Sequence, residues 1–381
     1  MDRKIIFLFF LLFSSVNIVA QPSPAVETEF VLGDYSTLGN HSGDSLEYIF
    51  GDIRSFTTDS KGNIYVADAS TQDIRKYNPK GKFISRIGRR GRGPGEFLEL
   101  SYIFMSENKL YAADPMQFRI SVFNLEGELL KTIITPKRSQ VLNFFRKVEP
   151  YQSKNFIVFY KQWGAGKWAK FNKDEIFHVW NSDFSQELES FGSFEAFGYK
   201  DNFARLMAQS RLGSYVRENN TFIVAPYIYQ GELLAFSWEN NEWQLEKVKG
   251  NKLFLNNPAY EALTTDDGRD DTSYITSTYD GSYYGKINYK DAGLFTHDGY
   301  LIHFLLKKIK TGKTSYGWEL GIEFFNSEFE HMGYTALRKF GYGELGRPPM
   351  IAHRDDNGYY YMRLRKNGAE VIEKFRLTLL E

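Results

Sequence analysis

Arginines and large aromatic side chains recur in segments of this sequence that have loop composition. Aromatic faces stack on sugar rings and other flat groups, whereas guanidinium forks bind carboxylate or phosphate. The same mixture is typical of protein interfaces, and rings packed between structural elements would produce it as well. The pattern favours noncovalent binding of an anionic glycan or an acidic peptide. The candidate ligand-binding residues are Arg89, Arg90, Arg92, Trp163, Trp168, Tyr227, Tyr229 and Arg363.

Motifs for catalysis and cofactor binding are absent from the sequence. It has no His-Glu-x-x-His, Gly-x-Ser-x-Gly, phosphate-loop or EF-hand spacing. The glycines from Gly88 to Gly95 have the wrong spacing for a nucleotide loop, and we expect them in a turn between two repeats. The acidic run over residues 266–271 lacks the alternating ligands of a calcium loop and contains Arg269, so a solvated loop is expected. We therefore predict no catalytic residues and no cofactor.

Composition narrows the classes of protein further. The 381 residues include 47 Lys+Arg and 47 Asp+Glu, and this balance argues against a nucleic-acid-binding protein. The hydrophobic fraction of 42% is too high for a disordered chain, and the 33 Phe and 25 Tyr favour strands. Cysteine is absent, which excludes disulfides, thiolate metal sites, cysteine nucleophiles and a lipid anchor on cysteine.

Residues 1–20 have the pattern of a cleaved signal peptide. Arg3 and Lys4 precede an apolar run over residues 5–13, and Ala20 ends a candidate cleavage site. The run is too short to span a bilayer, and no other stretch reaches the roughly 20 apolar residues that a transmembrane helix needs. An uncleaved anchor helix is the alternative. We expect export to the periplasm or the cell surface, with no transmembrane segment after cleavage.

An internal repeat of 46 residues organises the first part of the chain. This shift superposes Tyr65 on Tyr111 and Asp68 on Asp114 without a gap. Each copy has the pattern of several short strands separated by tight turns, and residues 53–58 supply a further strand to the first copy. Four antiparallel strands that recur every 40 to 50 residues are typical of a propeller blade.

Weaker copies extend the repeat to six blades. The third strand ends in an aromatic-Asn pair in four of them: Tyr77-Asn78, Phe123-Asn124, Trp180-Asn181 and Phe325-Asn326. Second strands are expected at residues 156–160, 222–225, 300–304 and 359–362, and third-strand ends at residues 236–238 and at Phe375. The blades start near residues 50, 98, 141, 203, 290 and 347. Only short helices are expected, at residues 203–209 and 258–263.

Two segments stand outside this regular pattern. Too few residues follow Phe375 for a complete sixth blade, so we predict that residues 26–32 pair as its outer strand and close the ring. A loose N-terminal tail is the alternative. Residues 251–292 form a long insertion between blades four and five, which is expected either to cap the propeller partly or to pack on its rim. Residues 21–381 are predicted to form a single domain.

The best-conforming repeats resemble a known type. Gly62-Asn63-Ile64-Tyr65-Val66-Ala67-Asp68, followed by residues 74–77, 81–84 and 88–97, resembles an NHL-type repeat. The whole chain is similar to exported bacterial six-bladed β-propellers. It departs from usual NHL blades before the third strand, where Gln72-Asp73 and Gln117-Phe118 replace an Asn-Arg pair. Proteins with this fold include binding platforms, lyases and lactone hydrolases, so the activity does not follow from the resemblance.

Histidines are the remaining candidates for metal binding. Propeller enzymes that resemble this fold often hold a metal in the central channel. We expect His297 in the turn after a first strand and His303 on a second strand, which leaves only His353 facing the channel. One histidine without carboxylate companions is a poor metal site, so no metal is predicted.

The sequence predicts an all-β, six-bladed propeller that binds a ligand without catalysis. The partner is expected to be a glycan, a peptide or an envelope protein. We expect it over the central channel, on the face that carries the candidate residues, partly covered by the insertion. The alternative is a propeller hydrolase or lyase that acts on a lactone or a sugar.

Overall fold

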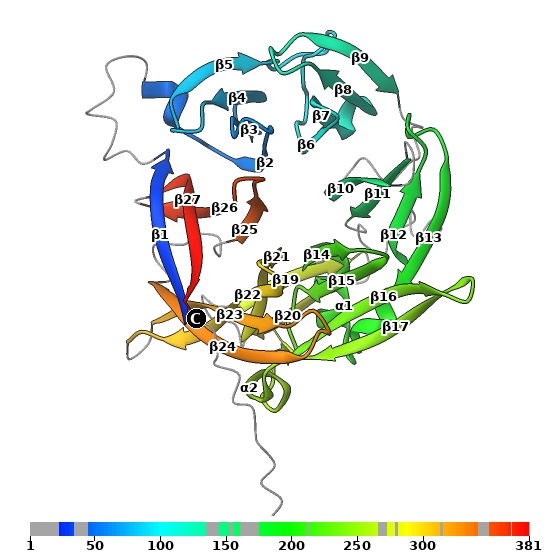
Figure 1. The fold of residues 1–381 in the computed structure, drawn as a ribbon, viewed down its shortest axis with the longest axis vertical. Coiled ribbons are helices and arrows are strands. Elements are labelled where there is room, and N and C mark those ends of the chain that lie inside the picture. Colours follow the sequence, from blue (N-terminus) through cyan, green and yellow to red (C-terminus); the bar gives the residue numbers. More distant parts are fainter. Residues whose placement is uncertain are drawn as a thin grey trace, which may run out of the picture.

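The computed structural model describes residues 23–33, 45–134, 145–151, 155–160, 175–211, 213–265, 273–278, 281–312, 315–341, 350–366 and 368–380. These residues form six four-stranded antiparallel sheets and one three-stranded sheet. Figure 1 shows the six larger sheets arranged around a ring, with their innermost strands at the centre. The prediction of an all-β, six-bladed propeller is confirmed.

The first three blades follow one another along the chain. Blade 1 contains β2 (Ile53–Thr58), β3 (Ile64–Asp68), β4 (Asp73–Tyr77) and β5 (Phe83–Ile87). Blade 2 contains β6 (Tyr102–Ser106), β7 (Lys109–Asp114), β8 (Arg119–Phe123) and β9 (Leu129–Ile134). Blade 3 contains β10 (Phe145–Tyr151), β11 (Asn155–Tyr160), β12 (Glu175–Trp180) and β13 (Glu187–Ser193).

The other three blades complete the ring. Blade 4 contains β14 (Gly213–Glu218), β15 (Thr221–Pro226), β16 (Glu232–Glu239) and β17 (Glu242–Lys249). Blade 5 contains β21 (Tyr289–His297), β22 (Tyr300–Lys310), β23 (Tyr316–Phe325) and β24 (His331–Gly341). Blade 6 contains β25 (Met350–Arg354), β26 (Tyr359–Lys366), β27 (Ala369–Leu380) and β1 (Ser23–Leu32). Short 3-10 helices cover Ser45–Tyr48, Pro115–Gln117 and Phe194–Phe197.

Asparagine fixes the hairpin between the third and fourth strands of several blades. Asn78 accepts hydrogen bonds through Oδ1 from the backbone N–H groups of Lys80 and Lys82, at 3.0 and 2.9 Å. The residues at the matching positions, Asn124 and Asn326, accept equivalent bonds. Because the side chain replaces backbone partners in a tight turn, the aromatic-Asn pair marks the end of the third strand.

The outer strand of blade 6 comes from the other end of the chain. Strand β1 pairs antiparallel with β27, from Ser23 opposite Leu380 to Leu32 opposite Ile372. Figure 1 shows the two strands side by side. The predicted pairing of residues 26–32 is therefore present, whereas its contribution to holding the ring closed stays a prediction.

The insertion before blade 5 has its own small sheet. It contains α2 (Lys252–Leu255) and the sheet of β18 (Tyr260–Leu263), β20 (Gly281–Ile287) and β19 (Ser273–Thr278). The sheet packs on helix α1 (Asn202–Arg211), where the backbone of Gly285 lies against the ring of Phe203. In Figure 1 the sheet projects onto blades 4 and 5 and not onto the centre of the ring.

The two expected helices had different outcomes. The helix at residues 203–209 is confirmed by α1, which also means that blade 4 begins at β14 and not near residue 203. The prediction of a helix at residues 258–263 is wrong. Tyr260 and Leu263 lie opposite Ile287 and Tyr284 in an antiparallel ladder. This pairing satisfies the backbone groups of the segment as a strand.

Candidate functional site

The propeller has two faces that carry different connections. We call the upper face the one with the connections between blades and the loops between second and third strands. The lower face carries the turns between first and second strands and the hairpins between third and fourth strands. Antiparallel alternation of the strands places these connections on opposite faces.

In the glycine-rich connection on the upper face, Arg89 forms an ion pair with a carboxylate of the same segment. Arg89 is 81% exposed, yet its guanidinium pairs with the Glu96 carboxylate through Nε and Nη2, both at 2.8 Å. The same carboxylate accepts a hydrogen bond from the Gly93 N–H at 2.8 Å. The segment joins β5 to β6, so the expected turn between repeats is confirmed. A ligand would have to compete with Glu96 for Arg89.

The neighbouring arginines are less restrained. Arg90 donates from Nη2 to the Ser70 carbonyl at 3.2 Å, and its side chain is exposed. Arg92 is also exposed, and its carbonyl accepts a bond of 3.4 Å from Arg119. Of the three arginines in this connection, these two have side chains that remain available to a ligand.

Tyr229 does not lie on the upper surface. The segment from Tyr227 to Tyr229 pairs with the start of β21: the Tyr229 N–H donates to the Tyr289 carbonyl at 3.1 Å, and the Tyr227 carbonyl accepts from Asp291. The Tyr229 ring is 0% exposed and its centroid is 4.4 Å from that of His303. The expected ligand contact through Tyr229 is corrected to a core contact between blades 4 and 5, whereas Tyr227 is half-buried.

Among the described residues, the remaining candidate Arg363 does not extend this surface. Arg363 lies in β26, is half-buried and donates to the Ile53 carbonyl at 2.7 Å. Trp163 and Trp168 lie outside the described residues, as does the acidic run over residues 266–271. The predicted site residues in the described chain therefore come from three separate connections or strands around the ring.

The histidines make contacts between and within blades. His297 ends β21 and is not in the following turn; its Nδ1 is 2.8 Å from the Tyr360 hydroxyl of blade 6. His353 lies on innermost strand β25, with Nε2 2.7 Å from Thr58 Oγ1 of blade 1. His303 Nδ1 is 3.2 Å from a Glu323 carboxylate oxygen. In the described part of the chain, no group of three or more His, Asp or Glu side chains is arranged to hold a metal ion.

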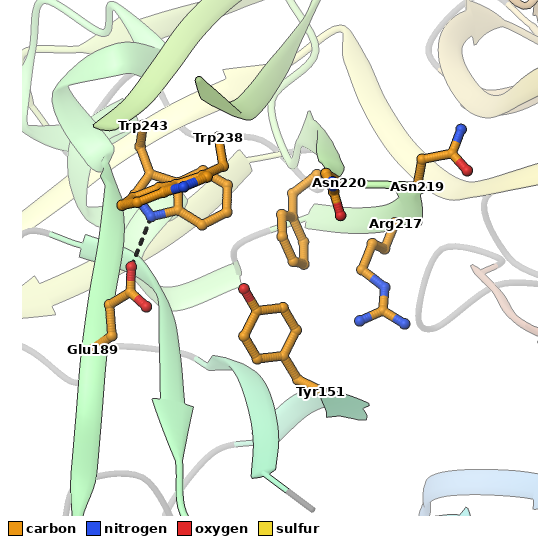
Figure 2. A pocket seen from close by; sticks show the side chains of 8 residues that line it. Tyr151, Glu189, Arg217, Asn219, Asn220, Trp238 and Trp243 are labelled. Atoms are coloured by element: carbon orange, nitrogen blue, oxygen red, sulfur yellow. Dashed lines mark hydrogen bonds between the residues drawn. The ribbon is translucent and has the colours of Figure 1, made fainter. Parts of the chain in front are cut away.

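A pocket on the lower face has the mixture of aromatic rings and arginine that the sequence predicts for the opposite face. Its volume is about 480 Å³, and it lies between blades 3 and 4. Figure 2 shows the two tryptophans on one side, with Tyr151 and Arg217 across from them. We call it the Trp238 pocket. Its lining residues are Tyr151, Glu189, Arg217, Asn219, Asn220, Phe222, Trp238 and Trp243.

Stacked aromatic rings make one wall of the Trp238 pocket rigid. Trp243 lies flat on Phe191 with ring centroids 3.7 Å apart, and its Nε1 donates to Glu189 at 2.8 Å. Trp238 stands nearly perpendicular to Trp243, at 68° and 5.4 Å between centroids. Trp238 is nevertheless 46% exposed. An exposed indole on a fixed base is a surface on which a flat ligand can stack.

Charged and polar groups face one another across the pocket. The Arg217 guanidinium lies 5.8 Å from the centroid of the Tyr151 ring. Burial, followed by the negative charge of Glu189, raises the pKa of the Tyr151 hydroxyl, and the charge of Arg217 opposes this effect. The phenol therefore stays protonated at neutral pH and can donate a hydrogen bond.

A local sequence pattern positions the tryptophans. Trp238 and Trp243 are cross-strand partners in the hairpin of β16 and β17. The hairpin turns at Asn240 and Asn241, whose φ values of 51° and 65° are those of a type I′ turn. The predicted third-strand end at residues 236–238 is confirmed by β16, whereas the pocket is not predicted from the sequence. Two tryptophans flanking an Asn-Asn turn were the signal that was available.

Comparison with known proteins supports the architecture. Residues 47–230 match a family described as a 6-bladed beta-propeller, just under half of the chain. The fold is a six-bladed β-propeller. A member of the DUF4221 family from Bacteroides vulgatus is similar in structure, with a TM-score of 0.52, 11% identity, and coverage of 95% of this chain and 100% of that one. No curated protein sequence matches this propeller significantly.

Other solved structures are similar to this chain with lower TM-scores. A Bacteroides fragilis protein named as an exported protein has a TM-score of 0.47 and 14% identity, covering 90% of this propeller and 93% of that chain. Virginiamycin B lyase from Staphylococcus aureus has a TM-score of 0.42 and 10% identity, covering 94% and 100%. At these identities the likeness concerns the fold alone. In the described residues, no helix is long and apolar enough to cross a membrane.

Proposed function

We propose that this chain is an exported, non-catalytic binding propeller of the bacterial cell envelope that holds a glycan in the Trp238 pocket. One observation carries the proposal: Trp238 is 46% exposed although it stands on the fixed stack of Trp243 and Phe191. Large aromatics usually bury most of their surface, so a rigid and exposed indole inside a concavity fits a binding surface.

The size and lining of the pocket support a small ligand or the end of a larger one. A volume of about 480 Å³ lies within the roughly 300–1,000 Å³ typical of small-molecule sites. Aromatic rings are combined there with the side-chain amides of Asn219 and Asn220, which both donate and accept hydrogen bonds. Hydroxyl groups on a sugar ring need that combination of partners.

Two arguments support glycan over peptide as the ligand. The pocket is lined by side chains at strand ends and in turns, including Asn219, Asn220 and Trp238. Extended peptides are usually bound by main-chain hydrogen bonds along an open strand edge, whereas the groups named here would contact the ligand through side chains. Stacking on Trp238 also suits the apolar face of a sugar ring.

Export is proposed from the N-terminal sequence. Arg3, Lys4 and the apolar run over residues 5–13 have the order of a secretion signal. A chain without cysteine needs no disulfide formation after export. We place the mature protein in the periplasm or on the cell surface.

A glycan and peptide array tests the proposal, probed with residues 21–381. The parent protein is expected to bind a set of glycans, and Trp238→Ala is expected to lose that set. Leu245→Ala is the matched control, because Leu245 is 44% exposed on the same blade but does not line the pocket. Glycan binding that survives Trp238→Ala unchanged would overturn the pocket as the site.

The upper face is the competing location. Two double variants probe it: Arg89→Ala with Arg92→Ala, and Trp163→Ala with Trp168→Ala. We expect both to bind the array as the parent does, because neither variant changes a residue that lines the Trp238 pocket. The alternative of a hydrolase or lyase predicts turnover of a bound lactone or sugar that is lost in chelator. Elemental analysis of the purified protein for a stoichiometric metal accompanies this assay.

A further inference from the structure

Resting on the proposed glycan-binding function, we infer that the Trp238 pocket takes a carboxylated sugar and that Arg217 binds the carboxylate. The ligand class is an oligosaccharide that contains a hexuronate. The inference comes from the charge layout of the pocket, which places an available guanidinium and a committed carboxylate on different sides of the exposed indole.

Arg217 has unused hydrogen-bonding capacity. A guanidinium has five N–H donors, and the described chain gives Arg217 one hydrogen bond, from Nη1 to the Pro150 carbonyl at 3.4 Å. Its other contact is with the Tyr151 ring. The side chain is exposed, and no carboxylate within the described residues forms an ion pair with it.

Two other exposed or partly exposed arginines in the described chain are held in ion pairs. Arg89 pairs with Glu96, and Arg338 pairs with Glu373, each at 2.8 Å. Those pairs lie outside the Trp238 pocket. Their guanidinium groups already have a carboxylate partner, so they are less available to a ligand. Arg217 lines the pocket and its guanidinium has no carboxylate partner among the described residues. This geometry suits a planar carboxylate held by two parallel hydrogen bonds.

Glu189 gives the ligand an orientation. Its carboxylate accepts the Trp243 Nε1 hydrogen at 2.8 Å, and Figure 2 shows it beside the tryptophans, away from Arg217. A carboxylate on the sugar is repelled from this side and attracted to the Arg217 side. Sugar hydroxyls can donate to the remaining lone pairs of Glu189. The ring thus spans the pocket over Trp238 with its acidic group toward Arg217.

Calorimetric titration with matched acidic and neutral sugars tests this inference. The probes are trigalacturonate and a hyaluronan tetrasaccharide, each compared with its methyl ester, which keeps the ring and removes the charge. We expect the parent to bind at least one acid about tenfold more tightly than its ester, as for one charge-assisted contact at a partly exposed site. The preference should shrink at 0.5 M salt.

Three variants locate the effect. Arg217→Ala should lose the preference for the acid over its ester, and Arg217→Lys should keep part of that preference. Arg376→Ala is the matched control, because Arg376 is also exposed and lies 4.5 Å over a tyrosine ring, that of Tyr359, in blade 6. It should behave as the parent does.

The outcomes separate this inference from the proposed function. Equal affinity of the parent for acid and ester, or an acid preference that survives Arg217→Ala, would overturn the role of Arg217 while leaving glycan binding intact. Stronger binding of a sulfated tetrasaccharide or of an acidic peptide than of either uronate would overturn the ligand class. Failure of every sugar on the array and in solution would overturn both proposals.

Discussion

Trp243 of blade 4 lies face to face with Phe191 of blade 3, with ring centroids 3.7 Å apart and 6° between the ring planes. The contact joins two blades at the wall of the pocket. Trp238, the cross-strand partner of Trp243, extends from this base into solvent. One tryptophan thus contributes mainly to the packing of the blades, and the other is available for binding.

This division predicts different effects for the two tryptophans on stability. Trp243→Ala removes a half-buried stack and the bond to Glu189, so we expect the free energy of unfolding to fall by about 2 kcal/mol or more. Trp238→Ala should change it by less than about 1 kcal/mol, as for most exposed substitutions. Urea unfolding followed by circular dichroism measures both. Equal losses for the two variants would contradict the division.

A buried ion pair makes blade 1 sensitive to a single substitution. Arg75 is 1% exposed, and its Nη2 is 3.1 Å from the Asp68 carboxylate. Arg75→Met should lower the free energy of unfolding by about 3–5 kcal/mol, because it leaves a buried carboxylate without its cation.

The repeat supplies the control for Arg75. Ser121 occupies the matching position in blade 2, is also fully buried, and its hydroxyl has no hydrogen-bond partner in the described structure. Ser121→Ala is expected to be neutral or slightly stabilising, since it removes an unsatisfied polar group. Comparable destabilisation by both substitutions would show that the ion pair is not the cause.

His353 should make the propeller sensitive to mild acid. Burial lowers the pKa of His353 to about 4, against the opposing negative charge of Asp355 and with a smaller contribution from the positive charge of Lys147. Because the folded pKa lies below the unfolded value of about 6.5, the stability linked to neutral His353 is present above pH 6.5. It is lost as the pH falls from 6.5 through about 4.

The matching experiment compares the parent with His353→Gln. Chemical unfolding at pH 7.5 and at pH 5 gives the difference in stability between the two proteins, in which the other histidines largely cancel. We expect the free energy of unfolding of the variant, relative to that of the parent, to be higher at pH 5 than at pH 7.5. A difference that is the same at both pH values would rule out His353 as the titrating group.

Strand β1 is expected to hold blade 6 together. Deleting residues 21–33 leaves β27 without its partner from Ile372 to Leu380 and turns it into an exposed edge. We predict a marked fall in melting temperature relative to the mature chain that begins at residue 21. An unchanged melting temperature would mean that ring closure does not depend on β1.

The sequence allowed the blades to be predicted because their signals are local. Tyr77-Asn78 and Phe325-Asn326 end third strands in the structure because the asparagine side chain completes the following turn. Residues 258–263 were misassigned because their strand depends on pairing with β20, a contact that no local pattern shows.

The proposed Trp238 pocket lies on the face opposite to the one predicted from the sequence, for a related reason. Tyr229 has the type of a binding residue, but its backbone pairs with β21 and its ring enters the core. Trp243 and Phe191 lie on different blades and meet only when the blades pack together. The composition of the proposed site could be expected from the sequence, whereas the position of the Trp238 pocket depends on contacts between blades.

A crystal structure of the mature protein soaked with the tightest glycan from the array tests the central claim most directly. Our account predicts the sugar ring in the Trp238 pocket, stacked on the exposed face of Trp238 and in contact with Asn219 or Asn220. A sugar bound instead on the upper face beside Arg90 and Arg92, with the Trp238 pocket holding only solvent, would contradict it.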